Sequence, residues 1–222
     1  QQPIEEDKLD PIAWAEQSYG YYTDEDLLFL ETETKKYFEN TDYSLIGNFG
    51  GAAFSNIAYV PGPHIPHPIG IRDPEEWFIS MMIRKEYILA VHQRQMEIQK
   101  KNLQMYHEAV GDRIDIIYMS GTDFGSQNGP LISPEIYREL FKPFHSQMNN
   151  WVHRNTGWKT FFHTCGSVAA FLDDFIEAGV DILNPIQISA AEMDPALLKG
   201  KYGSNFVFWG GGIDTQKTLP FG

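Results

Sequence analysis

Hydrophobic residues three or four positions apart, the spacing of one helix face, recur through much of the first half of the chain. One such stretch covers residues 24–39, and Thr23 with Asp26 forms a capping box at its start. A second covers residues 75–110 in two pieces and stops at Gly111, because glycine adopts the backbone conformation that ends many helices. These stretches are expected to be helices.

Short strand-like runs alternate with helical stretches in the rest of the chain. Runs rich in β-branched and aromatic residues predict five strands, at residues 43–49, 114–119, 158–163, 180–184 and 206–209. Further helices are expected at residues 134–155, with Pro143 as a kink, and at residues 168–178 and 195–199. The prolines of residues 61–68 predict an irregular loop. Strands separated by helices form βα units and a parallel sheet.

Two architectures share this pattern, the doubly wound sheet and the (β/α)8 barrel. The segment Gly47-Asn-Phe-Gly-Gly51 does not fit the G-x-G-x-x-G sequence of a dinucleotide-binding sheet. Polar residues and glycines instead follow every predicted strand, which in a barrel places them together on the C-terminal rim. We therefore predict an α/β fold of the (β/α)8 TIM-barrel type. It is expected as an incomplete barrel of about five parallel strands in one domain, residues 1–222.

Composition and charge narrow the class of protein. Of the 222 residues, 42% are apolar and 21% are charged, which excludes a disordered chain and a coiled coil. The formal net charge of −13 disfavours nucleic acid or an anionic membrane as a partner. No apolar run approaches the roughly 20 residues that span a bilayer. A single cysteine permits no internal disulfide. We expect a cytoplasmic protein that acts on a small molecule.

The sharpest chemical feature is the pair His163 and Cys165. Positions i and i+2 of an extended segment project to the same side, so the imidazole and the thiol can reach one ion or one substrate. Both groups are good zinc ligands, although zinc usually takes at least three protein ligands. The alternative is a buried cysteine beside a hydrogen-bonded histidine, with no metal.

Other polar residues leave a functional and a structural interpretation open. Asp123 follows a predicted strand, where it can act as an acid–base group or simply accept backbone hydrogen bonds in a turn. The glycines of residues 209–214 either bring backbone close to a ligand or turn a corner of the barrel. His145 is expected to reach solvent or cap its helix, and the Asp173-Asp174 pair to lie on a solvated helix face.

Four segments resemble the uroporphyrinogen decarboxylase superfamily. They cover residues 125–145, 162–168, 178–187 and 208–214, including Gly125-Ser-Gln-Asn-Gly-Pro130 and Trp209-Gly-Gly-Gly-Ile-Asp214. The resemblance extends over nearly everything after about Ser44. It implies a (β/α)8 barrel, in agreement with the pattern of strands, and it marks Gln127, Gln187 and Asp214 as substrate-binding candidates.

The superfamily catalyses two main reactions, and this chain has residues that match those of each branch. Its decarboxylases remove carboxyl groups from uroporphyrinogen, in porphyrin biosynthesis, without a cofactor; Tyr59 falls on their tyrosine and is, with Asp123, a catalytic candidate. The other branch uses zinc to move a methyl group between a corrinoid and a thiol such as coenzyme M. Those enzymes carry His-x-Cys where His163 and Cys165 stand in this chain, which makes these two residues the metal candidates.

The chemistry of the two branches favours the second. Zinc holds a thiol as the thiolate, the form that attacks a methyl group, whereas decarboxylation has no evident role for a His-x-Cys pair. We therefore predict a zinc-dependent methyltransferase that takes a methyl group from a corrinoid, with a corrinoid protein as a candidate partner. A decarboxylase with a tetrapyrrole substrate and a non-catalytic ligand-binding relative are the alternatives.

Aligned by resemblance, the five predicted strands are the third to the seventh of the barrel. The further cysteine ligand of the zinc branch then lies outside this chain. A site of His163 and Cys165 alone is expected to be incomplete and the chain by itself inactive, because two protein ligands bind zinc weakly. Two open sheet edges and an uncovered interior also predict self-association.

Overall fold

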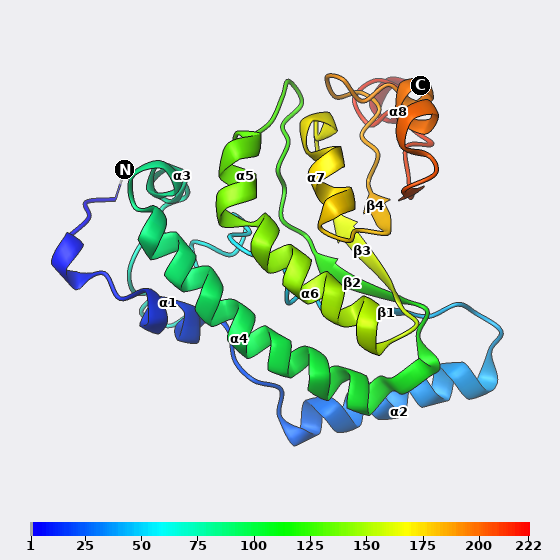
Figure 1. The fold of residues 1–222 in the computed structure, drawn as a ribbon, viewed down its shortest axis with the longest axis horizontal. Helices are drawn as coiled ribbons and strands as arrows, with labels where there is room; N and C mark the ends of the chain where they lie inside the picture. The colour runs from blue at the N-terminus through cyan, green and yellow to red at the C-terminus, as the bar shows by residue number, and fades with distance from the viewer. Residues whose placement is uncertain (1) are drawn as a thin grey trace.

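A computed structural model, which describes residues 2–222, contains a five-stranded parallel sheet (Figure 1). The strands are β1 (Ile46–Asn48), β2 (Ile116–Ser120), β3 (Lys159–His163), β4 (Ile182–Asn184) and β5 (Val207–Phe208). Their order in the sheet is their order in the chain. All five predicted strands are confirmed, and each is shorter than the run that predicted it.

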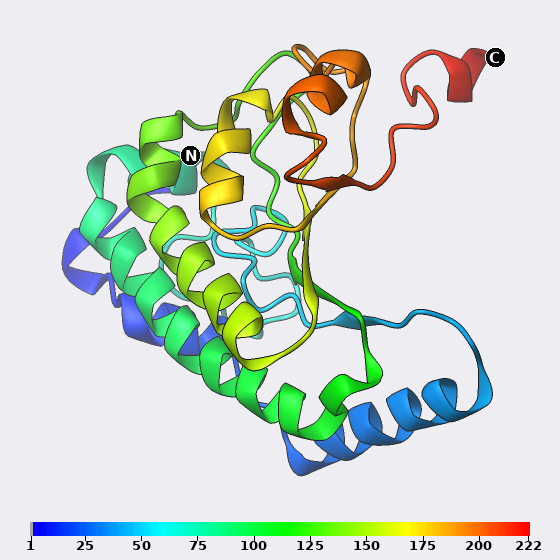
Figure 2. The ribbon, with the colours of Figure 1, turned by 45° about the vertical axis from the view of Figure 1, so that its right-hand side comes forward.

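The order of the strands identifies the architecture. A doubly wound sheet reverses its strand order at a switch point, whereas here each strand pairs with the next one along the chain. The sheet does not close, and β1 and β5 form its two edges. Helices cover one face only, as the edge-on view in Figure 2 shows. The α/β class and the open, barrel-type arrangement are thus as predicted.

The helices follow the apolar pattern closely. They are α1 (Pro11–Ser18), α2 (Asp24–Asn40), α3 (Pro74–Ile83), α4 (Lys85–Val110), α5 (Pro134–Leu140), α6 (Lys142–Asn155), α7 (Leu172–Glu177), α8 (Pro195–Tyr202) and α9 (Thr218–Phe221), with single 3-10 turns at Glu6–Lys8, Gly111–Arg113 and Ala169–Phe171. Gly111, with a φ of +57°, ends α4. The expected kink at Pro143 is instead a break at Phe141. Proline has no N–H and a fixed φ, so it suits the first turn of α6 better than a helix interior.

The N-terminal segment adds a helix that the apolar pattern did not predict. Asp10 caps the first turn of α1 through two backbone N–H groups, and Pro11 occupies its first position. Helix α2 begins with the predicted capping box of Thr23 and Asp26. Both helices pack against the long helix α4 (Figure 1). Within residues 2–222, no helix is both long enough and apolar enough to cross a membrane.

Two polar side chains that were expected at the surface are buried. His145 is fully buried, and its Nε2 lies 3.1 Å from the carbonyl oxygen of Ala52. Asp174 is also buried and forms ion pairs with Arg138 (3.0 Å) and Lys142 (2.8 Å). The expectation is therefore wrong for His145 and Asp174, whereas Asp173 is exposed as expected. Packing of α6 against its neighbours encloses these positions, and the ion pairs offset the cost of burying a carboxylate.

The open face of the sheet carries a row of aromatic side chains. The ring centroids of Tyr118 and Phe161 are 5.8 Å apart, and those of Phe161 and Trp209 are 5.7 Å apart. Side chains two residues apart on a strand share a face, so His163 lies on this face above Phe161, with Asn184 beside it in register. The row leads to the carboxyl end of the sheet, where polar residues gather.

Candidate metal centre

The loops that follow β2 and β3 pack against each other backbone to backbone. The N–H of Ser167 donates to the carbonyl oxygen of Ser126 at 2.8 Å. A Cβ atom on Gly125 would lie only 2.6 Å from the backbone nitrogen of Ser167, and Gly166 has a φ of +82°. Glycine is therefore required on both sides of the contact. The close approach holds the polar residues of the two loops together.

Asp123, His163 and Cys165 meet at this contact. The Sγ atom of Cys165 lies 3.4 Å from Nε2 of His163, which lies 3.9 Å from Oδ1 of Asp123. One potential ligand atom from each residue falls within 4.8 Å of the other two. All three side chains are partly exposed. The arrangement offers nitrogen, sulfur and oxygen to one metal ion and leaves an open side; we call these three residues the triad.

The neighbouring strand orients the histidine of the triad. Asn184 donates from Nδ2 to the carbonyl oxygen of Trp209 at 2.9 Å, which fixes the orientation of its amide. Its Oδ1 then accepts a hydrogen bond from Nδ1 of His163 at 2.8 Å. The imidazole therefore carries its proton on Nδ1, and Nε2 presents a lone pair to the triad. Metal-binding histidines are commonly oriented by such a hydrogen bond.

The electrostatic surroundings keep the thiol protonated when no metal is bound. Burial and the nearby carboxylate of Asp123 raise the pKa of Cys165 to about 11. Asp123 also accepts the backbone N–H of Cys165 at 2.6 Å, so the turn role that was an alternative for this residue is real. The same carboxylate can do both, because a carboxylate has several lone pairs. Cys165 at neutral pH is not a free thiolate nucleophile.

Gln127 and Gln187 form a chain of amides behind Cys165. The backbone N–H of Gly166 donates to Oε1 of Gln187 (2.9 Å), whose Nε2 donates to Oε1 of Gln127 (2.7 Å). Gln127 in turn donates to the carbonyl oxygen of Ser189. Both side chains are thus engaged within the protein and hold the loop of the triad. The substrate-binding role given to them by resemblance stays a prediction.

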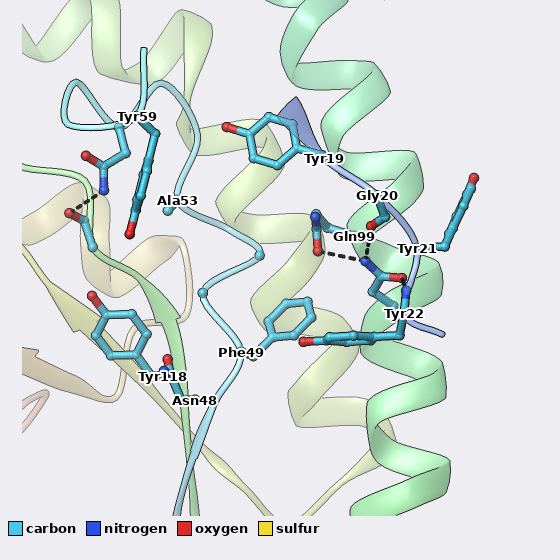
Figure 3. Close-up of a pocket in the computed structure, with 15 residues that line it drawn as sticks. Tyr19, Gly20, Tyr21, Tyr22, Asn48, Phe49, Ala53, Tyr59, Gln99 and Tyr118 are labelled. Carbon is cyan, nitrogen blue, oxygen red and sulfur yellow. Dashed lines mark hydrogen bonds between the residues drawn. The ribbon is translucent and has the colours of Figure 1, made fainter. Parts of the chain in front are cut away.

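Tyr59 lies in a separate cleft that adjoins the triad. The cleft has a volume of about 550 Å³ and is lined by Tyr59, Tyr118 and Gly121, among others (Figure 3). Tyr118 connects the two sites, because both Tyr59 and the triad residues Asp123 and Cys165 raise the pKa of its phenol, after burial as the main cause. The catalytic role of Tyr59 is not tested by this placement.

Asp214 has the contacts of a turn residue. Its Oδ1 accepts the backbone N–H groups of Gln216 (2.8 Å) and Lys217 (3.1 Å). In the described part of the chain, the group of potential metal ligands contains Asp123, His163 and Cys165 but not Asp214. The structure thus supplies no contact between Asp214 and the triad.

Two residues of the centre were not recognised as such from the sequence. Asp123 was assigned to catalysis rather than to the ligand set, and Asn184 was given no role. Asn184 is the last residue of a predicted strand, as His163 is, so its position at the carboxyl end of the sheet was a usable signal. The pairing of His163 with Asn184 depends on the register of β3 and β4.

Comparisons with known proteins assign the chain to no family. No protein-family model matches the chain, and no curated protein matches it. Among solved structures, it is similar to a methyltransferase from Methanosarcina mazei, with 17% sequence identity and a TM-score of 0.43. The match covers 72% of this chain and 40% of that one, so the chain spans well under half of that methyltransferase. A likeness this distant concerns the course of the backbone only. The resemblance to the uroporphyrinogen decarboxylase superfamily stays a prediction from the four sequence segments.

Proposed function

We propose that the triad binds zinc and that the chain belongs to a zinc-dependent enzyme that transfers a methyl group from a corrinoid to a thiol. The observation that carries the proposal is the convergence of Asp123, from the loop after β2, with His163 at the end of β3 and Cys165 in the loop after it, within 4.8 Å. Catalytic zinc sites typically have three protein ligands and one position open to water or substrate. The triad has this number of donors, and the partial exposure of its side chains leaves room for a fourth ligand.

The chemistry of the donor set fits zinc. Imidazole nitrogen, thiolate sulfur and carboxylate oxygen are its ordinary ligands in proteins, and a mixed set with a thiolate disfavours magnesium and calcium. Asn184 already holds the imidazole through Nδ1, with Nε2 toward Cys165 and Asp123. Cys165 would lose its proton on binding the metal. The structure therefore supplies the third protein donor that His163 and Cys165 lack by themselves.

The residues of the chain would then prepare a thiol substrate for reaction. A bound zinc ion lowers the pKa of a coordinated thiol, so that the substrate carries a nucleophilic sulfur at neutral pH. Asp123 and the amide chain of Gln127 and Gln187 fix the loop of Cys165. The adjoining cleft at Tyr118 gives a second substrate a place beside the triad. The corrinoid and a corrinoid protein that carries it are part of the proposal.

The cleft beside the triad supports this reaction over decarboxylation of a tetrapyrrole. Uroporphyrinogen carries many carboxylates, and carboxylates are usually bound by arginine. Among the described residues that line the cleft there is no arginine or lysine.

Zinc titration by isothermal calorimetry tests the proposal. One zinc ion per chain should bind at pH 7 with release of about one proton, because the Cys165 thiol is protonated before binding. Cys165→Ser and His163→Gln should each weaken binding by more than about 100-fold, beyond the usual effect of losing an outer hydrogen bond. His64→Gln, in a loop outside the triad, is the matched control and should bind zinc normally.

Turnover is tested by following the loss of methylcobalamin absorbance with coenzyme M as the acceptor. The proposal requires that the zinc-loaded protein from a full reading frame demethylates methylcobalamin, and that chelation or Cys165→Ser abolishes this. Absence of zinc binding, or binding that Cys165→Ser leaves unchanged, would refute the metal site.

A further inference from the structure

Aromatic side chains dominate the cleft next to the triad. Five tyrosines and one phenylalanine line it: Tyr19, Tyr21, Tyr22, Tyr59, Tyr118 and Phe49. They come from the segment before α2, the loop after β1 and strand β2. Figure 3 shows Tyr19 and Tyr59 on opposite sides of the open space, with Tyr118 below Tyr59. Glycines at positions 20, 50, 51 and 121 keep the cleft open between these rings.

Two side-chain amides of the cleft, those of Asn102 and Asn56, are used within the protein. Asn102 donates from Nδ2 to the carbonyl oxygen of Gly20 (2.8 Å) and to Oε1 of Gln99 (3.2 Å), and it accepts the N–H of Tyr22. Asn56 donates to the carbonyl oxygen of Gly121 at 3.0 Å. A sugar or a polar heterocycle needs free donors and acceptors around it. These amides are poorly suited to supply them.

Charge distinguishes a cationic ligand from an anionic one. None of the fifteen described residues that line the cleft is a lysine, arginine, histidine, aspartate or glutamate. The protein as a whole carries a net charge of −13, so its field attracts cations. One ring of the cleft already holds a cation at its outer side, since the Lys101 ammonium lies 5.0 Å from the ring centroid of Tyr21.

We propose that this cleft binds the head group of a methylated, quaternary ammonium compound. A quaternary ammonium cannot donate a conventional hydrogen bond, and it is recognised by the faces of several aromatic rings. The aromatic lining of the cleft and the absence of basic side chains among the described residues that line it suit such a ligand. Burial raises the pKa of Tyr22 to about 12, so its ring stays a neutral phenol at pH 7. The inference goes beyond the proposed function and does not depend on zinc.

The position of the cleft gives the ligand a place next to the triad. Gly121 lines the cleft and lies two residues before Asp123 in the same loop, and Tyr118 faces both sites. A bound ammonium group would therefore lie beside the triad rather than at a remote surface.

Binding of choline compared with its neutral isostere, 3,3-dimethylbutan-1-ol, tests the inference. The two have the same shape and differ only in charge, so calorimetry of both on the metal-free protein isolates the cation–π contribution. Choline should bind about tenfold more tightly than the isostere, which corresponds to a cation–π contribution within the usual range. Tetramethylammonium should compete with choline. Equal binding of the two compounds, or tighter binding of the isostere, would overturn the proposal.

Substitutions then locate the site. Tyr59→Leu should weaken choline binding at least about fivefold, and because Tyr59 is 57% exposed the variant should fold normally by circular dichroism. Tyr43→Leu changes an exposed tyrosine outside the cleft and should bind choline as the parent protein does. Zinc affinity should be the same in all three proteins, so loss of choline binding alone would leave the metal site standing. Choline binding that Tyr59→Leu leaves unchanged would refute the cleft as its site.

Discussion

Asn184 is the residue on which the geometry of the triad most depends without being part of it. It connects two fixed points, the carbonyl oxygen of Trp209 and Nδ1 of His163. Without its acceptor oxygen, the imidazole can rotate or exchange its proton between the two nitrogens. Nε2 would then no longer present a lone pair to the metal in every molecule.

Replacing Asn184 with alanine should lower zinc affinity by roughly 10- to 100-fold, the usual effect of removing a hydrogen bond that orients a histidine ligand. Zinc titration by calorimetry measures this change. Asn184→Asp is the matched control: it keeps an acceptor for Nδ1 and should retain most of the affinity. If the aspartate variant binds zinc as weakly as the alanine variant, orientation of His163 is not the role of Asn184.

At the level of residues, local spacing in the sequence predicted that His163 and Cys165 lie together. It did not predict that Asp123 and Asn184 lie beside them. His163 and Cys165 are two positions apart, so alternation along an extended segment was enough to place them on one side. Asp123 and Asn184 lie 40 and 21 residues from His163 in the chain. The position of Asp123 beside His163 depends on the backbone contact between Gly125 and Gly166, and that of Asn184 depends on the register of β3 and β4. Neither can be read from one segment of the sequence.

Two buried histidines connect α4 and α6 to the loop that follows β1. His92 of α4 lies with Nε2 2.5 Å from the hydroxyl of Ser55 and Nδ1 2.8 Å from the carbonyl oxygen of Leu140. His145 of α6 reaches the carbonyl oxygen of Ala52 from the other side. Burial lowers the pKa of His92 to about 4 and that of His145 to about 3. Both rings are neutral in the folded protein at neutral pH.

The free energy of unfolding should therefore decrease as the pH is lowered, before most carboxylates become protonated. In the unfolded chain a histidine has a pKa of about 6.5, so below that pH the unfolded state binds protons that the folded state excludes. The contribution of the neutral rings is complete above about pH 6.5 and is lost as the pH falls toward their folded values. Each unit of difference between the pKa of a histidine in the folded and the unfolded state corresponds to about 1.4 kcal/mol of free energy of unfolding.

Urea unfolding followed by circular dichroism at pH 7.5, 5.5 and 4.5 measures this dependence. His145→Gln should unfold more easily at pH 7.5 but show a smaller loss between pH 7.5 and 4.5 than the parent chain. His64→Gln, which changes an exposed loop histidine, is the control for the loss of a histidine as such. A parent chain whose free energy of unfolding is unchanged from pH 7.5 to 4.5 would contradict the assignment.

At the level of elements, the sequence carried most of the information. Periodicity located the long helices and all five strands, and Gly111 and the capping box at Thr23 marked helix ends correctly. Helix α1 was missed although Asp10 and Pro11 are a typical start, because its apolar face is short. The burial of His145 was not predicted, because the elements that pack against a helix decide which of its sides is buried. Local periodicity does not contain this information.

The whole molecule is a sheet with helices on one side and solvent on much of the other (Figure 2). Ile46 of β1 and Val207 of β5, at the two edges, are 45% and 56% exposed. Strand edges offer unpaired backbone groups to another chain, and exposed apolar side chains add to the attraction. The net charge of −13 opposes association at low ionic strength.

We therefore predict that the chain by itself self-associates, and more strongly as salt rises. Light scattering coupled to size-exclusion chromatography between 20 and about 500 mM NaCl, where the Debye length falls well below 10 Å, measures the mass. Val207→Lys should shift the population toward monomer, while Lys100→Glu, on the helical side, should not. A monomer of 25.4 kDa at every salt concentration would contradict the prediction.

The aromatic row on the open face has an optical consequence. Of the five tryptophans, Trp14, Trp77 and Trp158 are at most 2% exposed, whereas Trp209 is 45% exposed. Indole emission shifts to longer wavelength in water, and iodide quenches only rings that it can reach. Trp209 should thus supply most of the red, quenchable fluorescence of the chain. The carbonyl oxygen of Trp209 also accepts a hydrogen bond from Asn184, next to the triad. The fluorescence of Trp209 should therefore change when another chain covers the open face of the sheet and when zinc binds to the triad.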